Sequence, residues 1–352
     1  MKSTGLASFL RPGTDHYIRV LRLKPFLAEP LSVLEAGYPD PGTERIVLDA
    51  SHEGYAYTRD WLTATDRLKA ETGASIVFAQ TNPQFAVDAA GCGYTFSSFH
   101  HHAWRLLEQV RRYGHAEAGR ANLDRTPERA VLCMNNTPRI HRVLALKMLR
   151  DNLPADSFRG TLVMLASPKI SNATQTIERE AAAWNLDVPL DDLLGGILGW
   201  ADTGTDRNMV NLVDSIDTHL YEDTFFSLVT ETEMRRPDMR RYTEKSLKPL
   251  LMGHPVVILG NMSVVRQLEE LGFDLLRDEI DHSYDDEPHP IRRFEMAMQS
   301  ALNLARLSLP ERKAFLSRNK ARLAGNIAVI ESALMERYRA RWTGELQSPP
   351  RE

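Results

Sequence analysis

Short apolar runs alternate along the chain with segments in which apolar residues recur every three or four positions. Residues 45–50 and 74–79 are apolar runs, and each predicts a buried strand. Between them, residues 58–72 have the apolar spacing of an amphipathic helix. Strand, helix and strand in this order predict a βαβ unit, and therefore parallel strands.

The same pattern continues through the rest of the chain. Apolar runs predict four further strands, at residues 130–134, 161–165, 224–229 and 255–259. Helical spacing predicts four further helices, at residues 103–112, 140–149, 175–184 and 264–271. Residues 294–341 follow a helical pattern almost throughout. The pattern is interrupted at residues 308–310, where one helix is expected to end and the next to begin.

A polar, proline-containing segment at residues 152–159 is the best linker candidate. It predicts three regions, which are an N-terminal Rossmann-like lobe at 1–153, a C-terminal Rossmann-like lobe at 154–305, and C-terminal helices with a tail at 306–352. The expected fold class is therefore α/β with two lobes. Ligands of open parallel sheets bind beyond the carboxyl ends of the strands, so residues that directly follow the predicted strands are the candidate site residues.

Composition narrows the class of protein. Hydrophobic residues make up 43% of the 352 positions and charged residues 26%, which excludes a disordered or low-complexity chain. The formal net charge of -4 argues against nucleic acid as the main partner. Two cysteines are too few for a disulfide scaffold or a four-cysteine zinc site. The sequence has no apolar window of about 18 residues and no unbroken apolar signal segment near its start. We therefore expect a cytoplasmic protein without an integral membrane segment.

The segment before the last predicted strand has the features of a helix with a charged start. Thr243 is a good N-cap, with Glu244 and Lys245 in the first turn and Gly253 at the position that closes the helix. A helix N-terminus with a lysine suits a phosphate, and a carboxylate there can accept hydrogen bonds from a ribose diol. Pro249 breaks the pattern, because a proline inside a helix removes a backbone hydrogen bond.

This stretch resembles the donor-binding motif of GT-B glycosyltransferases, especially their fucosyltransferase and exostosin-like groups. The shared positions are Thr230-Glu231-Thr232, Tyr242-Thr243-Glu244-Lys245, Gly253, Pro255 and Gly260. Residues 280–285 continue the similarity, but His282 stands where the related pattern usually has an acid. The resemblance covers residues 218–292 well and the rest of the chain only in outline.

The resemblance implies two Rossmann-like lobes in a GT-B-like arrangement, with the C-terminal helices packing across them. It also implies that Lys245 contacts the donor phosphate, that Glu244 holds the ribose, and that Glu231 lies near the donor sugar or the helix terminus. The alternative for Glu244 and Lys245 is a solvated first turn in which the glutamate compensates the helix dipole.

A second group of polar residues follows the strand predicted at residues 45–50. Asp49, His52 and Glu53 are candidates for the base that deprotonates an acceptor hydroxyl, with Glu53 as first choice. The alternative is an ordinary Asp–Ser helix cap followed by solvated polar groups.

A third group follows the strand predicted at residues 130–134. Arg139, His141 and Arg142 place positive charge at a strand-to-helix junction, and planar arginines can grip a diphosphate bidentately. The alternative is a helix start with solvated arginines. The three adjacent histidines at 100–102 do not share a helix face, so no metal site is expected there.

The sequence therefore predicts a metal-independent glycosyltransferase without a cofactor. Its partners would be a nucleoside-diphosphate sugar and an acceptor hydroxyl on a glycan or another molecule. Two alternatives remain open. One is a non-catalytic module of GT-B-like fold that binds a sugar nucleotide, and the other is a sugar-nucleotide epimerase or hydrolase. The sequence lacks the glycine-rich and serine motifs of dinucleotide dehydrogenases, P-loop NTPases and α/β-hydrolases.

Overall fold

The computed structural model describes residues 15–19, 43–51, 58–88, 92, 94–135, 138–162, 169–186, 189, 192, 216–236 and 239–347. The chain divides into two compact units. The first unit comprises residues 1–105, 237–241 and 333–352, and the second comprises residues 106–236 and 242–332.

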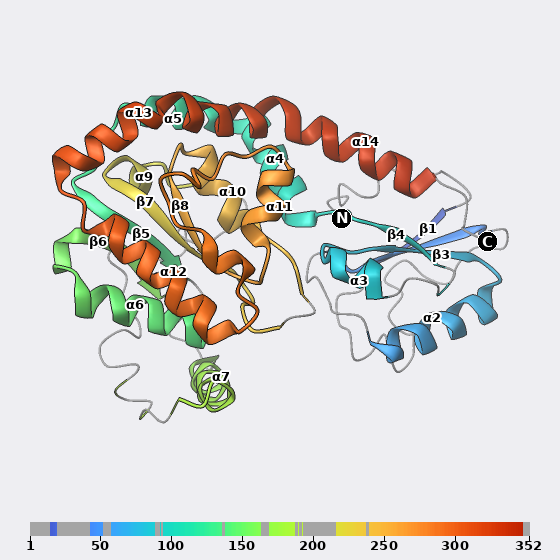
Figure 1. Ribbon diagram of the computed structural model, residues 1–352. Helices are drawn as coiled ribbons and strands as arrows, with labels where there is room; N and C mark the ends of the chain where they lie inside the picture. The colour runs from blue at the N-terminus through green and yellow to red at the C-terminus, as the bar shows by residue number, and fades with distance from the viewer. Residues whose placement is uncertain are drawn as a thin grey trace. The chain divides into compact units, whose positions relative to one another are not determined.

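A four-stranded parallel sheet forms the centre of the first unit (Figure 1). Its strands, in spatial order, are β1 (Asp15–Arg19), β2 (Arg45–Asp49), β3 (Ser75–Ala79) and β4 (Thr95–Ser97). The helices of this unit are α2 (Arg59–Thr72), α3 (Pro83–Asp88), the start of α4 (His101–Tyr113) and α14 (Leu334–Gln347).

The core of the first unit is built on aromatic side chains. The Trp61 ring of α2 meets the Phe78 ring of β3 edge-on at 5.8 Å between centroids, and it meets Phe85 of α3 at 5.6 Å. Trp342 of α14 is completely buried, with its ring centroid 4.4 Å from that of Phe99. Aromatic pairs of this kind bury large apolar areas, so α14 is an integral part of the unit although it comes late in the chain.

The second unit contains another four-stranded parallel sheet, in the order β6-β5-β7-β8. Its strands are β5 (Arg129–Asn135), β6 (Phe158–Leu162), β7 (Thr224–Thr230) and β8 (Val256–Leu259). Its α-helices are the rest of α4, α5 (His115–Asn122), α6 (Ile140–Asn152), α7 (Lys169–Ala183), α9 (His219–Glu222), α10 (Glu244–Leu251), α11 (Val264–Glu270), α12 (Pro290–Ala305) and α13 (Leu309–Ala328). Short 3₁₀ turns lie at Ala155–Ser157 and Ser283–Asp286, and a π-helical turn at Val329–Ala333 joins α13 to α14.

The strand order creates a switch point in the second sheet. The chain leaves β5 through α6 and reaches β6 on one side, whereas it leaves β7 through α10 and reaches β8 on the other side. Neighbouring strands β5 and β7 therefore send their connections in opposite directions. In open parallel sheets, ligands bind beyond the carboxyl ends of two neighbouring strands whose connections leave in opposite directions.

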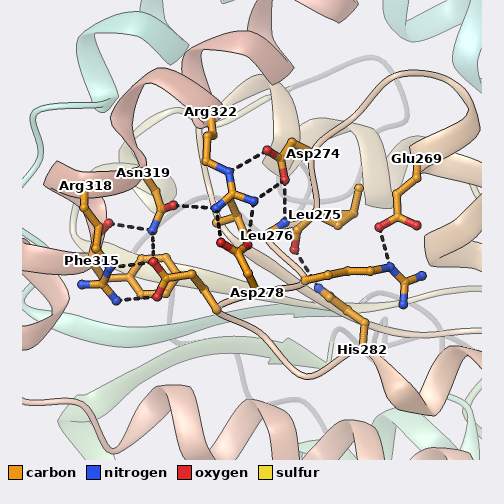
Figure 2. A network of polar contacts seen from close by, with 12 residues as sticks. Glu269, Asp274, Leu275, Leu276, Asp278, His282, Phe315, Arg318, Asn319 and Arg322 are labelled. Atoms are coloured by element: carbon orange, nitrogen blue, oxygen red, sulfur yellow. Dashed lines mark hydrogen bonds and ion pairs between the residues drawn. The ribbon is translucent and has the colours of Figure 1, made fainter.

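A network of polar contacts fixes α13 to the segment after α11 (Figure 2). Arg322 donates to both carboxylate oxygens of Asp274, at 2.6 and 2.9 Å, and to those of Asp278, at 3.0 and 2.7 Å. Arg318 grips both carboxylate oxygens of Glu279 at 2.6 Å. These groups are partly exposed, so the ion pairs contribute less to stability than their number suggests. They connect residues 274–279 to α13.

The parallel α/β fold expected from the hydrophobic pattern is confirmed. Most predicted strands are found with their bounds shifted by one or two residues. The strand expected at residues 161–165 begins earlier, at Phe158, and residues 163–165 lie outside the described part of the chain. None of the described helices is both long enough and apolar enough to cross a lipid bilayer.

The division into units differs from the expected one. The boundary falls at residues 105/106 and not at 153/154, because β5 belongs to the second sheet and α6 lies in the second unit. The C-terminal helices do not form a region of their own either. Residues up to 332 belong to the second unit and residues 333–352 to the first.

Candidate functional site

The carboxylate of Glu180, a residue of α7, binds the start of α6. Arg139 is the N-cap residue of α6, and its Nη1 donates to Oε1 of Glu180 at 2.9 Å. The backbone N–H of Ile140 donates to the other oxygen, Oε2, at 2.8 Å. Glu180 comes from α7, and its negative charge lies at the positive end of the α6 dipole. Arg139 therefore has a carboxylate partner that the local sequence does not reveal.

His141 and Arg142 are buried and bind the backbone at the end of β7. His141 Nε2 lies 2.9 Å from the carbonyl oxygen of Glu231, and Arg142 Nη2 donates to the same oxygen at 3.1 Å. A carbonyl oxygen only accepts, so the imidazole carries its hydrogen on Nε2. Burial, together with the neighbouring charge of Arg142, lowers the pKa of His141 to about 3. Burial also lowers the pKa of Arg142, to about 10. At neutral pH the pair is thus a neutral imidazole beside a guanidinium cation, and neither side chain is a solvated group.

Glu231 lies at the N-terminus of α10 and binds its N-cap residue. Its carboxylate accepts from the backbone N–H of Thr243 at 2.8 Å, from Thr243 Oγ1 at 2.7 Å and from Ser246 Oγ at 2.6 Å. Thr243 Oγ1 in turn accepts from the N–H of Lys245 at 3.3 Å, which confirms Thr243 as the N-cap. Of the two positions implied for Glu231, its carboxylate occupies the helix terminus. The carboxylate of Glu231 therefore lies beside the helix start at which the sequence predicts a phosphate-binding site.

Glu244 and Lys245 differ in their exposure. Glu244 is only 6% exposed, so the alternative of a solvated first turn is wrong for this residue. Lys245 keeps 32% of its side chain exposed, and its Nζ donates to Glu244 Oε1 at 3.1 Å and to Thr243 Oγ1 at 3.3 Å. The ammonium group is therefore paired within the turn but still reaches solvent.

Glu231 joins the two strand-to-helix junctions. Its backbone oxygen is held by α6 and its carboxylate by α10. The structure consequently brings all six predicted donor-binding residues to the carboxyl ends of β5 and β7, within the second unit. These residues are Arg139, Arg142, Glu231, Thr243, Glu244 and Lys245.

A cavity of about 230 Å³ opens at this switch point. Its lining comes from the start of α6, the end of α7 and the loop at residues 232–235 after β7. Three arginines, Arg139, Arg179 and Arg235, share it with two glutamates, Glu180 and Glu233. With His141 neutral, the formal charge of the lining is three positive minus two negative, or +1. Arg139 is the predicted donor-binding residue that reaches this cavity directly.

The loop that lines the cavity is anchored by two buried side chains. Arg293 of α12 is 3% exposed and donates to the carbonyl oxygens of Met234, Glu287, Pro288 and Gly260, the last at 3.1 Å. Asn261, just after β8, donates from Nδ2 to the carbonyl oxygen of Arg236 at 3.1 Å. These two contacts connect the loop after β7 to α12 and to the end of β8.

Of the three candidate bases, the structure describes Asp49, which lies in the first unit. Asp49 ends β2, is 1% exposed, and accepts from the backbone N–H of Ser51 at 3.0 Å, from Ser51 Oγ at 2.5 Å and from the hydroxyl of Tyr17. These contacts make Asp49 the residue that closes the turn after β2. His52 and Glu53 lie outside the described residues.

Four charged residues of the cavity were not predicted from the sequence. Arg179 and Glu180 belong to a predicted helix, but no local pattern separates them from surface residues. Glu233 and Arg235 follow β7 directly, and the rule that ligands bind beyond strand ends could have drawn attention to them.

The described residues contain no group of three or more His, Cys, Asp and Glu side chains arranged to hold a metal ion. At the start of α4, His100 Nδ1 accepts from the N–H of Ala103 at 3.2 Å, and the His101 and His102 rings meet edge-on at 5.6 Å. His100 thus binds the backbone of the helix that directly follows it.

The chain matches no protein-family model, and neither a curated protein nor a solved structure shows significant similarity to it.

Proposed function

We propose that the second unit binds the diphosphate of a nucleoside-diphosphate sugar and that the protein is a metal-independent glycosyltransferase of GT-B-like architecture. The observation that carries this proposal is the arginine-lined cavity at the switch point between β5 and β7. Planar guanidinium groups bind phosphate oxygens bidentately. The net positive lining favours an anion over a neutral ligand.

The size of the cavity fits one part of such a donor. Ligand pockets usually measure about 300–1,000 Å³, so a cavity of about 230 Å³ holds the charged centre of the donor and not the whole molecule. The base and the sugar of the donor would extend beyond it. Lys245, whose ammonium group reaches solvent at the neighbouring junction, is placed to attract the anion without lining the cavity.

The chemistry assigned to the second unit is stabilisation of the leaving group. In direct displacement, the acceptor oxygen forms a bond to the anomeric carbon while the bond from that carbon to the diphosphate oxygen breaks. The diphosphate leaves with the electron pair, and a base takes the acceptor proton. Arg139, Arg179 and Arg235 would stabilise the developing negative charge electrostatically. Glu53 and His52 remain the proposed bases.

Arg139→Ala tests the donor site. The variant is expected to lose ten- to a hundredfold in affinity for the nucleoside diphosphate, because one charge-assisted contact is worth about 1.5–3 kcal/mol. Lys245→Ala is expected to lose less, since Lys245 lies outside the cavity lining. Thermal-shift and calorimetric titrations with UDP, GDP, CMP, dTDP and their sugars provide the measurement.

Lys147→Ala is the matched control for Arg139→Ala. Lys147 lies on α6, the helix that Arg139 precedes, and it pairs with Asp151 at the surface. It should bind like the unmodified protein. The proposal fails if no nucleotide binds the protein, or if Arg139→Ala and Lys245→Ala both keep full affinity and turnover.

A second candidate is a non-catalytic module that binds a sugar nucleotide. It is favoured by His282, which stands where the related glycosyltransferase pattern has an acid and is buried against the carbonyl oxygen of Leu275. Turnover separates the two candidates, because a pure binding module is stabilised by the sugar nucleotide but never releases nucleoside diphosphate.

A further inference from the structure

Three helices that begin at the carboxyl edge of the second sheet share one unusual feature. Each has a carboxylate from outside the helix at its N-terminus. Glu231 binds Thr243, the N-cap residue of α10, and Glu180 accepts from the N–H of Ile140 at the start of α6. Asp285 accepts from the N–H groups of Val265 and Arg266 at the start of α11, at 2.9 and 3.0 Å. The positive ends of these helices are therefore compensated before any ligand arrives.

Glu180 differs from the other two carboxylates in its access to the cavity. Glu231 and Asp285 are each 1% exposed and closed in by protein. The side chain of Glu180 is 19% exposed and forms part of the cavity lining. Glu180 belongs to α7. Its two partners, Arg139 Nη1 and the N–H of Ile140, both lie at the start of another helix, α6.

The geometry at Glu180 is that of a bound anion. Its two oxygens each accept one hydrogen bond, one from a guanidinium and one from a backbone amide at a helix start. A phosphate group binds the same two kinds of donor. An anionic ligand in this cavity therefore meets a site in which a carboxylate already uses the best donors.

We infer that the carboxylate of Glu180 competes with the ligand: it occupies the position of one phosphate group in the ligand-free protein and is displaced when a diphosphate binds. This inference rests on the proposed diphosphate site. When a ligand with one phosphate group binds, its phosphate replaces the carboxylate on the same donors, so little binding free energy is gained. A diphosphate brings a second anionic group, which can engage Arg179 or Arg235 while the first replaces the carboxylate. Glu180 thus adds the same displacement cost to both ligands, and only the diphosphate has a second contact that offsets this cost.

Removing the charge of Glu180 tests this inference. Glu180→Gln keeps the shape of the side chain, and its amide oxygen can still accept from Ile140. The control is Glu178→Gln, which removes the same charge from an exposed position on the same helix. Affinities of both variants and of the unmodified protein are measured by calorimetry with inorganic pyrophosphate and with inorganic phosphate at one salt concentration.

Glu180→Gln is expected to bind pyrophosphate at least tenfold more tightly than the unmodified protein, a difference of about 1.4 kcal/mol. Its affinity for single phosphate should rise by a similar factor, because neither ligand then has to displace a charged carboxylate. Glu178→Gln should leave both affinities unchanged. The melting temperature of ligand-free Glu180→Gln should fall, because α6 loses a charged cap. A tighter-binding but less stable variant is not explained by a purely structural role.

Two results would overturn the inference, and they are distinguishable. If the unmodified protein binds pyrophosphate and Glu180→Gln binds it equally or more weakly, Glu180 does not compete with the anion, but the proposed diphosphate site stands. If none of the three proteins binds pyrophosphate or any nucleoside diphosphate, the proposed function itself fails, and the inference fails with it.

Discussion

His282 shows how a buried side chain can have its protonation state set by its neighbours. The N–H of Ile258 donates to Tyr284 Oη at 2.9 Å, which leaves the Tyr284 hydroxyl to donate to His282 Nδ1 at 2.8 Å. His282 Nε2 then donates to the carbonyl oxygen of Leu275 at 2.8 Å, a contact drawn in Figure 2. This chain of donors requires a neutral imidazole, and burial lowers its pKa to about 4. An ionised acid here has no hydrogen to give to Leu275.

We therefore expect His282→Glu to lower the free energy of unfolding by about 3 kcal/mol, because a carboxylate would be buried against a carbonyl oxygen. His282→Gln should lose only about 1 kcal/mol, since its amide both donates and accepts. Urea denaturation of the two variants measures the difference. Equal losses would show that the hydrogen-bond chain does not matter for stability.

Individual residues also show which parts of the site could be predicted from the sequence. Thr243 and Gly253 were identified because capping residues depend on local sequence. Gly253 has φ of +65°, and the N–H of His254 donates to the carbonyl oxygen of Pro249 at 2.9 Å, which closes the end of α10. Glu180 was missed because its partner Arg139 lies 41 positions away. Such a contact depends on how helices pack, which residue patterns do not specify.

At the scale of elements, close helix packing depends on one glycine. A Cβ atom added at Gly119 in α5 would lie 2.0 Å from the carbonyl oxygen of Leu251, the last residue of α10. The absence of a side chain therefore allows α5 and α10 to approach each other. Gly325 in α13 offers a contrast, because an added Cβ there meets nothing within 4 Å.

This contrast predicts opposite effects for the same substitution. Gly119→Ala should lower the free energy of unfolding by about 2–3 kcal/mol, because backbone atoms must move apart. Gly325→Ala should raise it by about 0.5–1 kcal/mol, because alanine loses less backbone entropy in a helix. Chemical denaturation of both variants checks this. A stabilised Gly119→Ala would mean that α5 and α10 are not packed closely.

Elements with a clear apolar pattern could be predicted from the sequence, whereas elements without such a pattern could not. The fully buried strands β2 and β7 are apolar runs that stand out in the sequence. β1 reads Asp-His-Tyr-Ile-Arg and β4 has only three residues, so neither was predicted. The edge strands β1 and β4 need less apolar character than central ones. α10 continues through Pro249, although a proline inside a helix is expected to interrupt it.

At the scale of the whole molecule, the strand pattern did not reveal which strands pair. β5 was assigned to the first lobe because it precedes the apparent linker at 152–159. The structure pairs it with β6 and β7 instead. Short polar segments join strands within a sheet as readily as they join domains, so a linker-like composition alone does not define a boundary. Pairing is decided by long-range contacts that each strand makes with others.

Stability should fall as the pH drops below about 6.5. Burial lowers the pKa of His141 to about 3 and that of His282 to about 4, and it lowers the pKa of His254 well below its usual value. These pKa values are depressed in the folded state, so the stabilisation is complete above the unfolded pKa and is lost as the pH falls. Near pH 5 the unfolded chain binds up to three more protons than the folded chain, which gives a slope of about 4 kcal/mol per pH unit.

Denaturation between pH 8 and pH 5 measures this slope. His282→Gln removes one of the three groups, so its slope should fall to about 2.7 kcal/mol per pH unit. The raised pKa of Asp285, caused by burial, opposes the trend at the acidic end. A flat pH profile in the unmodified protein would mean that these histidines take up protons without unfolding the second unit.

The division of the chain also bears on the order in which the protein is completed during synthesis. Residues 1–105 emerge from the ribosome first, yet Phe99 and Ser98 find their partners only when Trp342 and Glu345 have been made. The second unit has all its residues once Ser332 has been added. Nascent domains usually fold in the order in which they begin, starting from the N-terminus. In this chain the unit that begins first is the last to be finished.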